Sequence, residues 1–316
     1  MNNKIKEISI VMSVKNGERF LNNAIKSILN QSFKNFEFII VNNDSHDKTQ
    51  DILISYQKKD SRIKVLTNSN NETLYEGRTK AINFSNFEWF ALMDADDECH
   101  QDRIKKQIEY INYTPYENLA ILSTYGKYIN SKGKIIANKN SGPTNLDSFN
   151  KIYKNNDSFS ILDPSIVVKK KAFFEVGGYL KNNIAADLDL SYKIAEAGYL
   201  IQTIDRPLYY YRIHETSYSV QNSLKQCEVT HFINYNMRKR RSGQIQISEE
   251  KFYEEFWNKF FYRIPRKILD YSKTFYKISA HLFIQKKYFS SLINLFIAFI
   301  FSPRYVLKRL IYHFFN

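Results

Sequence analysis

The sequence is poor in cysteine, in long apolar runs and in glycine-rich loops. Its 316 residues include two cysteines, Cys99 and Cys227, too few for a disulfide framework, so a reducing cytosol is favoured. One apolar stretch, residues 288–301, has 14 residues, whereas a helix that crosses a bilayer needs about 20. The N-terminal residues lack the apolar core and cleavage site of a signal peptide. These shortages argue against a secreted precursor and against a membrane-spanning protein.

Apolar side chains are plentiful, and the charge is unevenly placed. Apolar types make up 43% of the chain and aromatics 16%, enough to bury a sizeable core, which excludes a generally disordered chain. The net charge is +14, and residues 238–316 alone hold 16 basic and 5 acidic side chains. A basic, aromatic-rich tail suits an anionic membrane surface or a nucleic acid.

Strands and helices alternate through the first hundred residues. Apolar, β-branched runs predict strands at 8–14, 36–41, 63–66 and 89–93, and helical spacing predicts helices at 21–29, 47–59 and 73–84. This alternation predicts an α/β fold with a Rossmann-like, mostly parallel sheet flanked by helices. In such sheets, ligands bind beyond the carboxyl ends of the strands.

The pattern is less regular beyond residue 100. We expect a helix over 104–111, two strands within 119–136, a loop over the Asn- and Ser-rich residues 140–160, a strand at 165–168, helices at 171–176 and 187–197, and strands at 200–204 and 208–213. After about residue 217 apolar residues recur at helical spacing, and no glycine follows Gly243. The tail is therefore predicted to be helical.

Three carboxylates follow the fourth strand, at Asp94, Asp96 and Asp97. Like charges this close raise one another's pKa unless a cation lies between them. Mg²⁺ and Mn²⁺ prefer hard oxygen ligands and often share them with substrate phosphates. The triplet indicates a site for a divalent metal, with a solvated acidic turn as the alternative.

Two further polar clusters lie near the ends of predicted elements. Asp187 and Asp189 open a helix, where they can cap it or where Asp187 can act as a general base toward an acceptor hydroxyl. His214 follows a strand and can be a metal ligand, although a lone histidine is more often structural. A metal for a diphosphate leaving group and a base for a hydroxyl suffice for in-line sugar transfer with inversion.

In their order and spacing these motifs resemble the family 2 glycosyltransferases of GT-A fold. The similarity covers about residues 7–219. Four segments show the similarity. Two are the opening ISIVMSVKNGERFLNNAIKSILNQSFKNFEFIIVNND and the Asp94-Ala95-Asp96-Asp97 stretch, which matches a DxD motif. The other two are Gly177-Gly178-Tyr179 with Asp187 and Asp189, and LYYYRIHETSYS at 208–219. The resemblance implies an inverting, metal-dependent transferase that moves a hexosyl or N-acetylhexosaminyl group from a nucleotide-sugar, expected to be a UDP-sugar.

The resemblance also implies roles for individual residues. Ser13 and Asn43 would line the nucleoside pocket, and Asn71 and Arg78 would lie beside the base and diphosphate. Asp94 would contact the donor ribose, while Asp96 and His214 would bind Mn²⁺ or Mg²⁺. Asp187 would be the catalytic base, with Asp189 in support.

The chain departs from the family pattern at four places. Asn42 and Asn43 stand where two aspartates are usual, and Lys15 replaces a tyrosine that flanks the base, which leaves the nucleotide open. Ala186 replaces a glutamate and Asp163 a histidine, which leaves the acceptor open. None of these changes removes the predicted metal site or base.

The predicted organisation has two parts. Residues 1–219 would form the catalytic domain, with a nucleotide-binding half at about 1–97 and an acceptor half at 98–219, and residues 220–316 would form a basic, aromatic-rich helical extension. This extension either associates with an anionic membrane surface or is an ordinary helical subdomain. In the first case, the enzyme is cytoplasmic and peripheral on the inner face of the membrane. Its acceptor would then be a glycan or glycolipid of lipooligosaccharide, capsule or a similar surface polymer.

Two other functions stay open at this point. A sugar-nucleotide pyrophosphorylase would share the sheet and the metal, but it usually needs a glycine-rich loop that Lys15-Asn16-Gly17-Glu18 does not provide. A basic nucleic-acid-binding protein is supported only by the tail, and because the sequence has no known docking motif we expect no nucleic-acid partner. The sequence predicts no oligomeric state.

Overall fold

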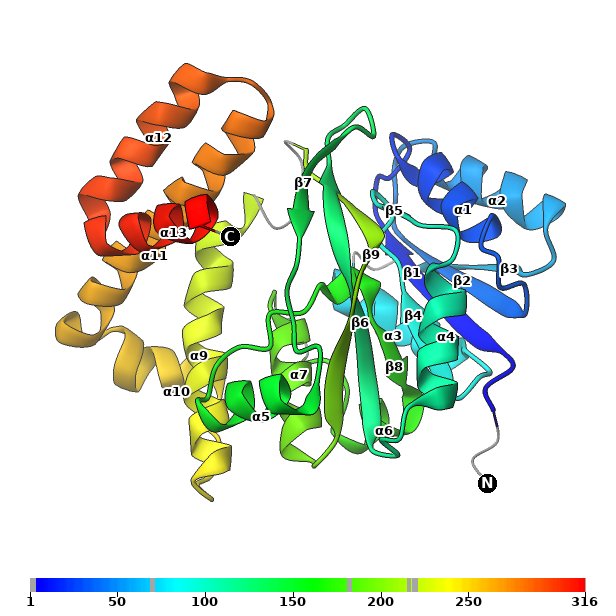
Figure 1. The fold of residues 1–316 in the computed structure, drawn as a ribbon, viewed down its shortest axis with the longest axis horizontal. Helices are drawn as coiled ribbons and strands as arrows, with labels where there is room; N and C mark the ends of the chain where they lie inside the picture. The colour runs from blue at the N-terminus through cyan, green and yellow to red at the C-terminus, as the bar shows by residue number, and fades with distance from the viewer. Residues whose placement is uncertain (1–3, 69–71, 181–183, 215–216, 218–220, 316) are drawn as a thin grey trace. The chain divides into compact units, whose positions relative to one another are not determined.

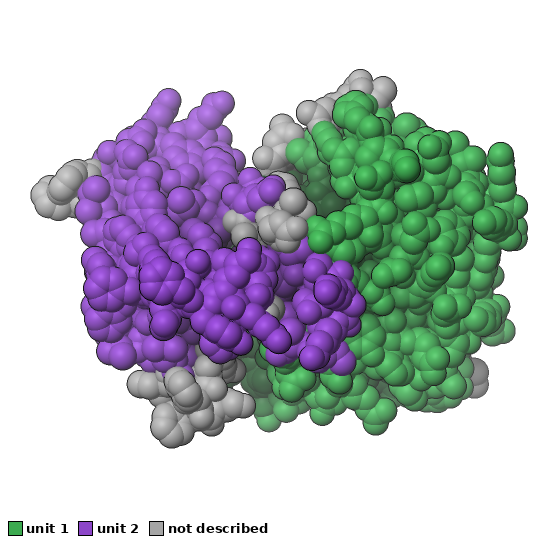
Figure 2. Space-filling model, turned by 90° about the horizontal axis from the view of Figure 1, so that it is seen from above, with its two compact units in different colours: residues 1–129, 137–212 green, residues 130–136, 213–316 purple. Residues whose placement is uncertain are grey.

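The structure is a computed structural model, and it describes residues 4–68, 72–180, 184–214, 217 and 221–315. The chain forms two compact units (Figure 2). Unit 1 consists of Met1–Ile129 and Ala137–Arg212, and unit 2 consists of Asn130–Ile136 and Ile213–Asn316. The predicted domain boundary after residue 219 stays a prediction.

Strands and helices alternate through unit 1 (Figure 1). Its elements are β1 (Ile8–Val14), α1 (Leu21–Leu29), β2 (Phe36–Asn43), α2 (Thr49–Lys59), β3 (Ile63–Asn68), α3 (Leu74–Phe84), β4 (Trp89–Leu92), β5 (Glu98–Cys99), α4 (Arg103–Tyr113), β6 (Leu119–Ile129), α5 (Leu146–Lys154), η1 (Asp163–Ser165), β8 (Val167–Lys169), α6 (Lys170–Glu175), α7 (Ala186–Glu196) and β9 (Leu200–Arg212). Strand β7 (Ile135–Lys139) runs from unit 2 into unit 1 and pairs with β6.

The strands form one mixed sheet in the order β3-β2-β1-β4-β8-β6-β9-β5. Strands β3, β2, β1 and β4 are parallel, and Ile10 of β1 lies opposite Phe38 of β2. Strand β8 is antiparallel to both β4 and β6. Every residue of β1 and β2 is buried, as expected for strands that are covered on both faces. The predicted fold class is confirmed.

Two details of the sequence prediction are wrong. Residues 140–160 are not simply a loop, because α5 lies within them. Asn145 caps this helix by accepting from the backbone N–H of Ser148, and Phe149 buries one face against Phe159. The high Asn and Ser content hid a helix whose first Asn is its N-cap.

The second correction concerns residues 200–213, which form the single long strand β9 rather than two strands. The exposed residues Asp205, Arg206 and Pro207 interrupt the apolar pattern but not the strand. The register with β6 shifts next to Tyr125, which pairs with Pro207. This irregularity within β9 interrupts the apolar pattern of the sequence, which is why the pattern predicted two strands.

Unit 2 is helical, as predicted. It contains α9 (Ser223–Arg241), α10 (Glu249–Phe252), the π-helical turn η2 (Tyr253–Trp257), α11 (Phe260–Ile284), α12 (Tyr288–Phe301) and α13 (Pro303–Phe315). The buried rings of Phe252 and Trp257 pack with His231 and Tyr235. Among the described residues, no helix combines the length and apolar character needed to span a membrane.

Candidate active site

Ser13 and Asn43 lie at the carboxyl ends of the neighbouring strands β1 and β2. Both side chains are buried, and the Asn43 amide donates to Ser13 Oγ over 2.7 Å. Asn43 Oδ1 accepts from the amide of Asn68, at the end of β3, over 2.8 Å. Parallel pairing brings these three strand ends to the same edge of the sheet. The two residues predicted to line a nucleoside pocket are thus in contact with each other.

The acidic triplet follows β4 at the same edge. One carboxylate oxygen each from Asp94, Asp96 and Asp97 lies within 4.8 Å of the others. Asp97 is buried, and its Oδ1 accepts from the backbone N–H of Arg212 over 2.7 Å. Burial and the charges of Asp96 and Asp94 raise the pKa of Asp97 well above its ordinary value. The fold therefore holds like charges together against their repulsion.

The triplet has the right donor chemistry for a divalent metal. Carboxylate oxygens are hard ligands, which Mg²⁺ and Mn²⁺ prefer. A cation between the three groups would offset the repulsion that raises the pKa of Asp97. Asp94, Asp96 and Asp97 therefore fit a divalent metal.

Arg78 of α3 joins two acidic segments that are far apart in the sequence. Its guanidinium is almost fully buried and donates to Asp94 Oδ1 over 2.5 Å and to Asp163 Oδ2 over 2.7 Å. Burial raises the pKa of Asp163 to about 7 against the opposing effect of Arg78. Burial also raises the pKa of Asp94, although Arg78 opposes this shift too. The role of Arg78 beside a diphosphate stays a prediction.

Asp187 lies in the first turn of α7 and is held by Tyr75 of α3. The Tyr75 hydroxyl donates to Asp187 Oδ1 over 2.9 Å, and the Tyr75 ring packs on Tyr179 with 4.9 Å between centroids. Burial and the charges of Asp187 and Asp163 raise the pKa of Tyr75 well above its ordinary value. Tyr75 consequently stays protonated and acts as a donor to the carboxylate.

The first turns of α3 connect all these groups. Thr73 and Glu76 form a capping box that fixes the start of the helix. Gly77 lets the helix approach the strand ends, because a Cβ at this position would lie 2.4 Å from Ser13 Oγ and 2.5 Å from Asn43 Nδ2. Four consecutive residues of α3 thus contact three parts of the predicted site. Gly77 lies against Ser13 and Asn43, Arg78 binds the acidic loop, and Tyr75 binds the predicted base, Asp187.

Asn71, Asp189 and His214 are the remaining predicted site residues. Asn71 lies outside the described residues. Asp189 is buried and pairs with Lys193 over 2.6 Å, one turn along α7. His214 belongs to unit 2, where it is buried and its backbone N–H donates to Ser217 Oγ over 3.2 Å. The metal role of His214 and the supporting role of Asp189 stay predictions.

Sequence reasoning missed two residues that organise the site. Tyr75 was overlooked, although its position three residues before Arg78 places both on the same face of a predicted helix. Arg212 ties the acidic loop to β9, because its Nε donates to the carbonyl of Asp96 over 2.6 Å and its guanidinium lies over the ring of Phe20 at 4.7 Å. No local pattern in the sequence could have paired Arg212 with a loop more than a hundred residues away.

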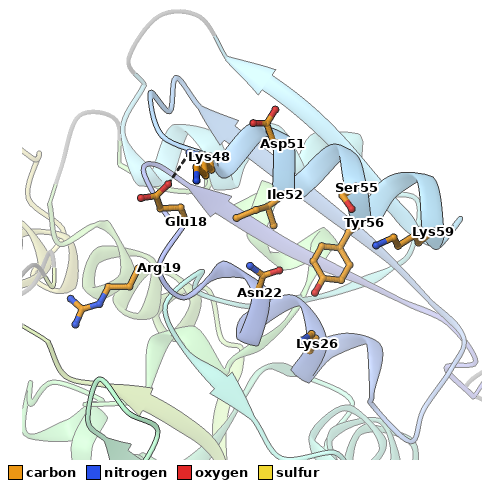
Figure 3. A pocket seen from close by; sticks show the side chains of 10 residues that line it. All are labelled: Glu18, Arg19, Asn22, Lys26, Lys48, Asp51, Ile52, Ser55, Tyr56 and Lys59. Carbon is orange, nitrogen blue, oxygen red and sulfur yellow. Dashed lines mark hydrogen bonds between the residues drawn. The ribbon is translucent and has the colours of Figure 1, made fainter.

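A surface hollow of about 950 Å³ lies elsewhere on unit 1, between α1 and α2 (Figure 3). Its lining mixes basic and acidic side chains, including Lys26 of α1 and Asp51 and Lys59 of α2. None of the predicted site residues lines it. The hollow is therefore separate from the α3 network.

Comparison with known proteins decides the family. The family model described as glycosyl transferase family 2 matches residues 9–171, which include most of β1, the acidic triplet, Arg78 and Asp163. The chain belongs to glycosyl transferase family 2. It is a glycosyltransferase, and the pyrophosphorylase and nucleic-acid-binding alternatives are set aside.

Two curated relatives of this glycosyltransferase match over most of their length. An uncharacterized glycosyltransferase of Methanocaldococcus jannaschii is 26% identical over 259 residues, which cover 81% of this chain and 86% of the relative. The O-antigen biosynthesis glycosyltransferase WbnJ of Escherichia coli is 27% identical over 72% of this chain and 92% of its own.

Solved structures share the fold of this glycosyltransferase at low identity. The TarS 1–349 structure from S. aureus in complex with UDP-GlcNAc has a TM-score of 0.57 and 16% identity, over 92% of this chain and 89% of that chain. The mannosyltransferase PcManGT from Pyrobaculum calidifontis, in complex with GDP-Man and Mn²⁺, has a TM-score of 0.54 and 12% identity, over 94% of this chain and 87% of that chain. At such identities the likeness concerns the fold alone.

Proposed function

We propose that this family 2 member is an inverting, metal-dependent glycosyltransferase that moves a sugar from a nucleotide-sugar to a hydroxyl of a glycan or glycolipid. One observation carries the proposal: the first turns of α3 hold Asp187 through Tyr75 and Asp94 through Arg78. A base and the acidic triplet are thereby fixed by one rigid element, and such positioning is what in-line displacement requires.

Asp187 acts as the base in this proposal. Because Tyr75 donates to Oδ1, Oδ2 accepts the proton of the acceptor hydroxyl while the hydroxyl oxygen attacks the anomeric carbon. The bond from that carbon to the diphosphate breaks on the opposite face, so the configuration is inverted. Asp163 stands where the family frequently has a histidine, and we assign it to the acceptor side together with Asp187.

Asp96, with Asp94 and Asp97 beside it, would hold the metal, and His214 would be a further ligand of the metal or the diphosphate. A divalent cation there, Mn²⁺ or Mg²⁺, supplies charge neutralisation for the departing diphosphate. The three-carboxylate cluster supports this role, as does the Mn²⁺ of the PcManGT complex.

The donor and acceptor are proposed from the relatives. UDP-GlcNAc in the TarS complex favours a UDP-sugar, while GDP-Man in the mannosyltransferase keeps other nucleotides open. The O-antigen role named for WbnJ favours a cell-surface polysaccharide or lipooligosaccharide as the product. Synthesis of such a polymer on a lipid-linked acceptor would place the enzyme in the cytoplasm, peripheral on the inner face of the membrane.

A two-step experiment tests the proposal. Nucleotide-sugars are first screened for a rise in the melting temperature with and without Mn²⁺, because ligands that bind only the folded state stabilise it. The donor found in this way is then used for transfer, and the anomeric configuration of the product is read by NMR. We expect a Mn²⁺-dependent shift, absent in Asp96→Asn, and an inverted product. A product of retained configuration would overturn the role of Asp187.

A further inference from the structure

The α11–α12 hairpin of unit 2 has its small side chains inside and its large apolar side chains outside. Helix α12 faces α11 with the buried residues Ser291 and Ala298, spaced seven residues apart. Helix α11 meets them with Ser272 and Ser279, also seven residues apart and buried. A seven-residue spacing keeps each pair on one helix face. The seam between the two helices is therefore lined by small residues at these positions, while Tyr271 and Phe275 of α11 stack on Phe301 at the end of α12.

Serine hydroxyls bind backbone carbonyls across this seam. Ser272 Oγ donates to the carbonyl of Ala298 over 2.8 Å, and Ser279 Oγ donates to the carbonyl of Ser291 over 2.9 Å. Ser291 Oγ donates back to the carbonyl of Ser279 over 2.8 Å. Small residues that bring helix backbones together, with Ser hydroxyls bonded between helices, are typical of helix pairs packed in lipid.

The opposite face of α12 is apolar and exposed. Phe289, Leu292, Ile293, Phe296 and Ile300 follow helical spacing, and they are between 45% and 79% exposed. Tyr288 and Phe299 extend the same face. A contiguous patch of this kind marks an interaction site rather than an ordinary surface. We call these seven residues the outer face of α12.

Positively charged residues flank α12 in the sequence. Lys286 and Lys287 directly precede it, while Arg304, Lys308 and Arg309 lie in the following helix α13. Residues 271–316 contain no Asp or Glu. A lipid bilayer with anionic headgroups matches this arrangement, because each basic residue near its surface adds about 1 kcal/mol of attraction.

We propose that the outer face of α12 is a membrane-docking surface that inserts into one leaflet of an anionic bilayer, with the helix axis parallel to the membrane plane. Helix α12 has 14 residues, or about 21 Å at 1.5 Å per residue, so it suits the interface rather than a crossing. In this orientation the basic residues at both helix ends reach the headgroups. The inference rests on the proposed function only in that this function locates the enzyme at a membrane.

A second copy of this chain is a poorer occupant of the same face. Pairing two outer faces would bring two sets of basic residues together without any acidic residue of 271–316 to compensate, and like charges repel. The observations therefore favour lipid.

Flotation of the full chain with vesicles tests the proposal. The vesicles are phosphatidylcholine alone or phosphatidylcholine with phosphatidylglycerol. We expect the wild type to float with the anionic vesicles and the double variant Phe289→Ser, Phe296→Ser to bind at least about tenfold more weakly. The matched control Ile245→Ser removes another exposed apolar side chain of unit 2, one that is 88% exposed, and should float like the wild type.

A fluorescence measurement reports the depth of insertion. The native Trp89 and Trp257 are buried, so a tryptophan introduced by Phe296→Trp reports on the outer face. Its emission should shift to shorter wavelength with anionic vesicles, whereas that of Ile245→Trp should not. Equal flotation of the double variant, or no shift for Phe296→Trp, would overturn the proposal. So would self-association without lipid that the double variant abolishes, since the face would then bind a second copy.

Neither readout depends on turnover. If the wild type transfers sugar but does not float with anionic vesicles, only the docking surface is contradicted. If the wild type floats but transfers no sugar, only the proposed function is contradicted.

Discussion

The first turns of α3 in unit 1 and the α11–α12 hairpin in unit 2 bury opposite kinds of side chain. Around α3, an arginine and a tyrosine are buried, and hydrogen bonds and ion pairs join them to three partly buried carboxylates. In the hairpin, serines and an alanine are buried, while phenylalanine, leucine and isoleucine are exposed. Both arrangements reverse the usual distribution for a water-soluble protein.

The difference shows that each reversal suits a different environment. Buried charges are costly unless they are paired, and the α3 network pairs them where a charged sugar diphosphate is proposed to bind. Exposed large apolar residues are costly in water, and the hairpin presents them where lipid is proposed to lie. Stability measurements can test this comparison. The stability of the α3 region should depend on charge pairing, and that of the hairpin should depend on the size of the side chains between its helices.

Arg78→Met should give the largest loss of stability. It leaves Asp94 and Asp163 without their shared partner, and the removal of one member of a buried ion pair costs about 3–5 kcal/mol. Urea unfolding measures the effect. The matched control is Arg62→Met, because the Arg62 side chain is 27% exposed whereas that of Arg78 is 2% exposed, so the cost should stay within about 1 kcal/mol. Equal losses of stability in both variants would show that the ion pairs of Arg78 contribute no more than a surface ion pair.

Asp163→Asn should change how stability depends on pH. The pKa of Asp163 is raised to about 7 in the folded chain from 3.8, so the folded state keeps a proton that the unfolded state releases. Its stabilising contribution is complete below the unfolded pKa and is lost as the pH rises through about 7. Urea unfolding should therefore show the wild type losing about 1–3 kcal/mol relative to Asp163→Asn over this range. Parallel pH curves for the two proteins would rule out this burial effect.

Ser279→Val should destabilise the hairpin by about 1–3 kcal/mol. The larger side chain overpacks the seam with α12 and removes two hydrogen bonds to Ser291. The same substitution at Ser290, which is exposed on α12, serves as the control and should cost little. Thermal unfolding of both variants makes the comparison. If Ser290→Val lowered the stability as much as Ser279→Val, close packing of small residues between α11 and α12 would not be what stabilises the hairpin.

Tyr75→Phe should have the smallest effect, and it should act on turnover. It removes the hydroxyl that donates to Asp187, a contribution of about 1 kcal/mol or a fivefold to tenfold fall in kcat. The KM for the donor should stay unchanged, because Tyr75 positions the base and does not bind the nucleotide. Tyr113→Phe alters an exposed tyrosine and should leave kcat as it is. A matching rise in KM would instead give Tyr75 a role in donor binding.

Periodic and local features were predictable from the sequence. The first strand and helix, β1 and α1, have the predicted limits because apolar periodicity alone specifies them. The acidic triplet was recognised because three carboxylates in four residues follow a buried strand. The helix α5 was missed because an Asn-rich segment carries the composition of a loop, although its capping box is a helix signal.

Long-range pairing was not predictable. The contact between Tyr75 and Asp187 joins residues more than a hundred positions apart, and neither periodicity nor motif spacing encodes it. The same holds for Arg212, whose contacts to the acidic loop depend on β9 lying next to β5. The sequence also predicted a basic aromatic tail without indicating which side of α12 would be exposed, since that depends on how α11 packs.

The most direct test of the account measures transfer and donor affinity together in Asp187→Asn. If Asp187 is the base, kcat should fall by about 10²–10⁴-fold, while the calorimetric Kd for the nucleotide-sugar in the presence of Mn²⁺ stays at the wild-type value. Transfer at near the wild-type rate, or loss of donor binding together with transfer, would contradict the proposed role.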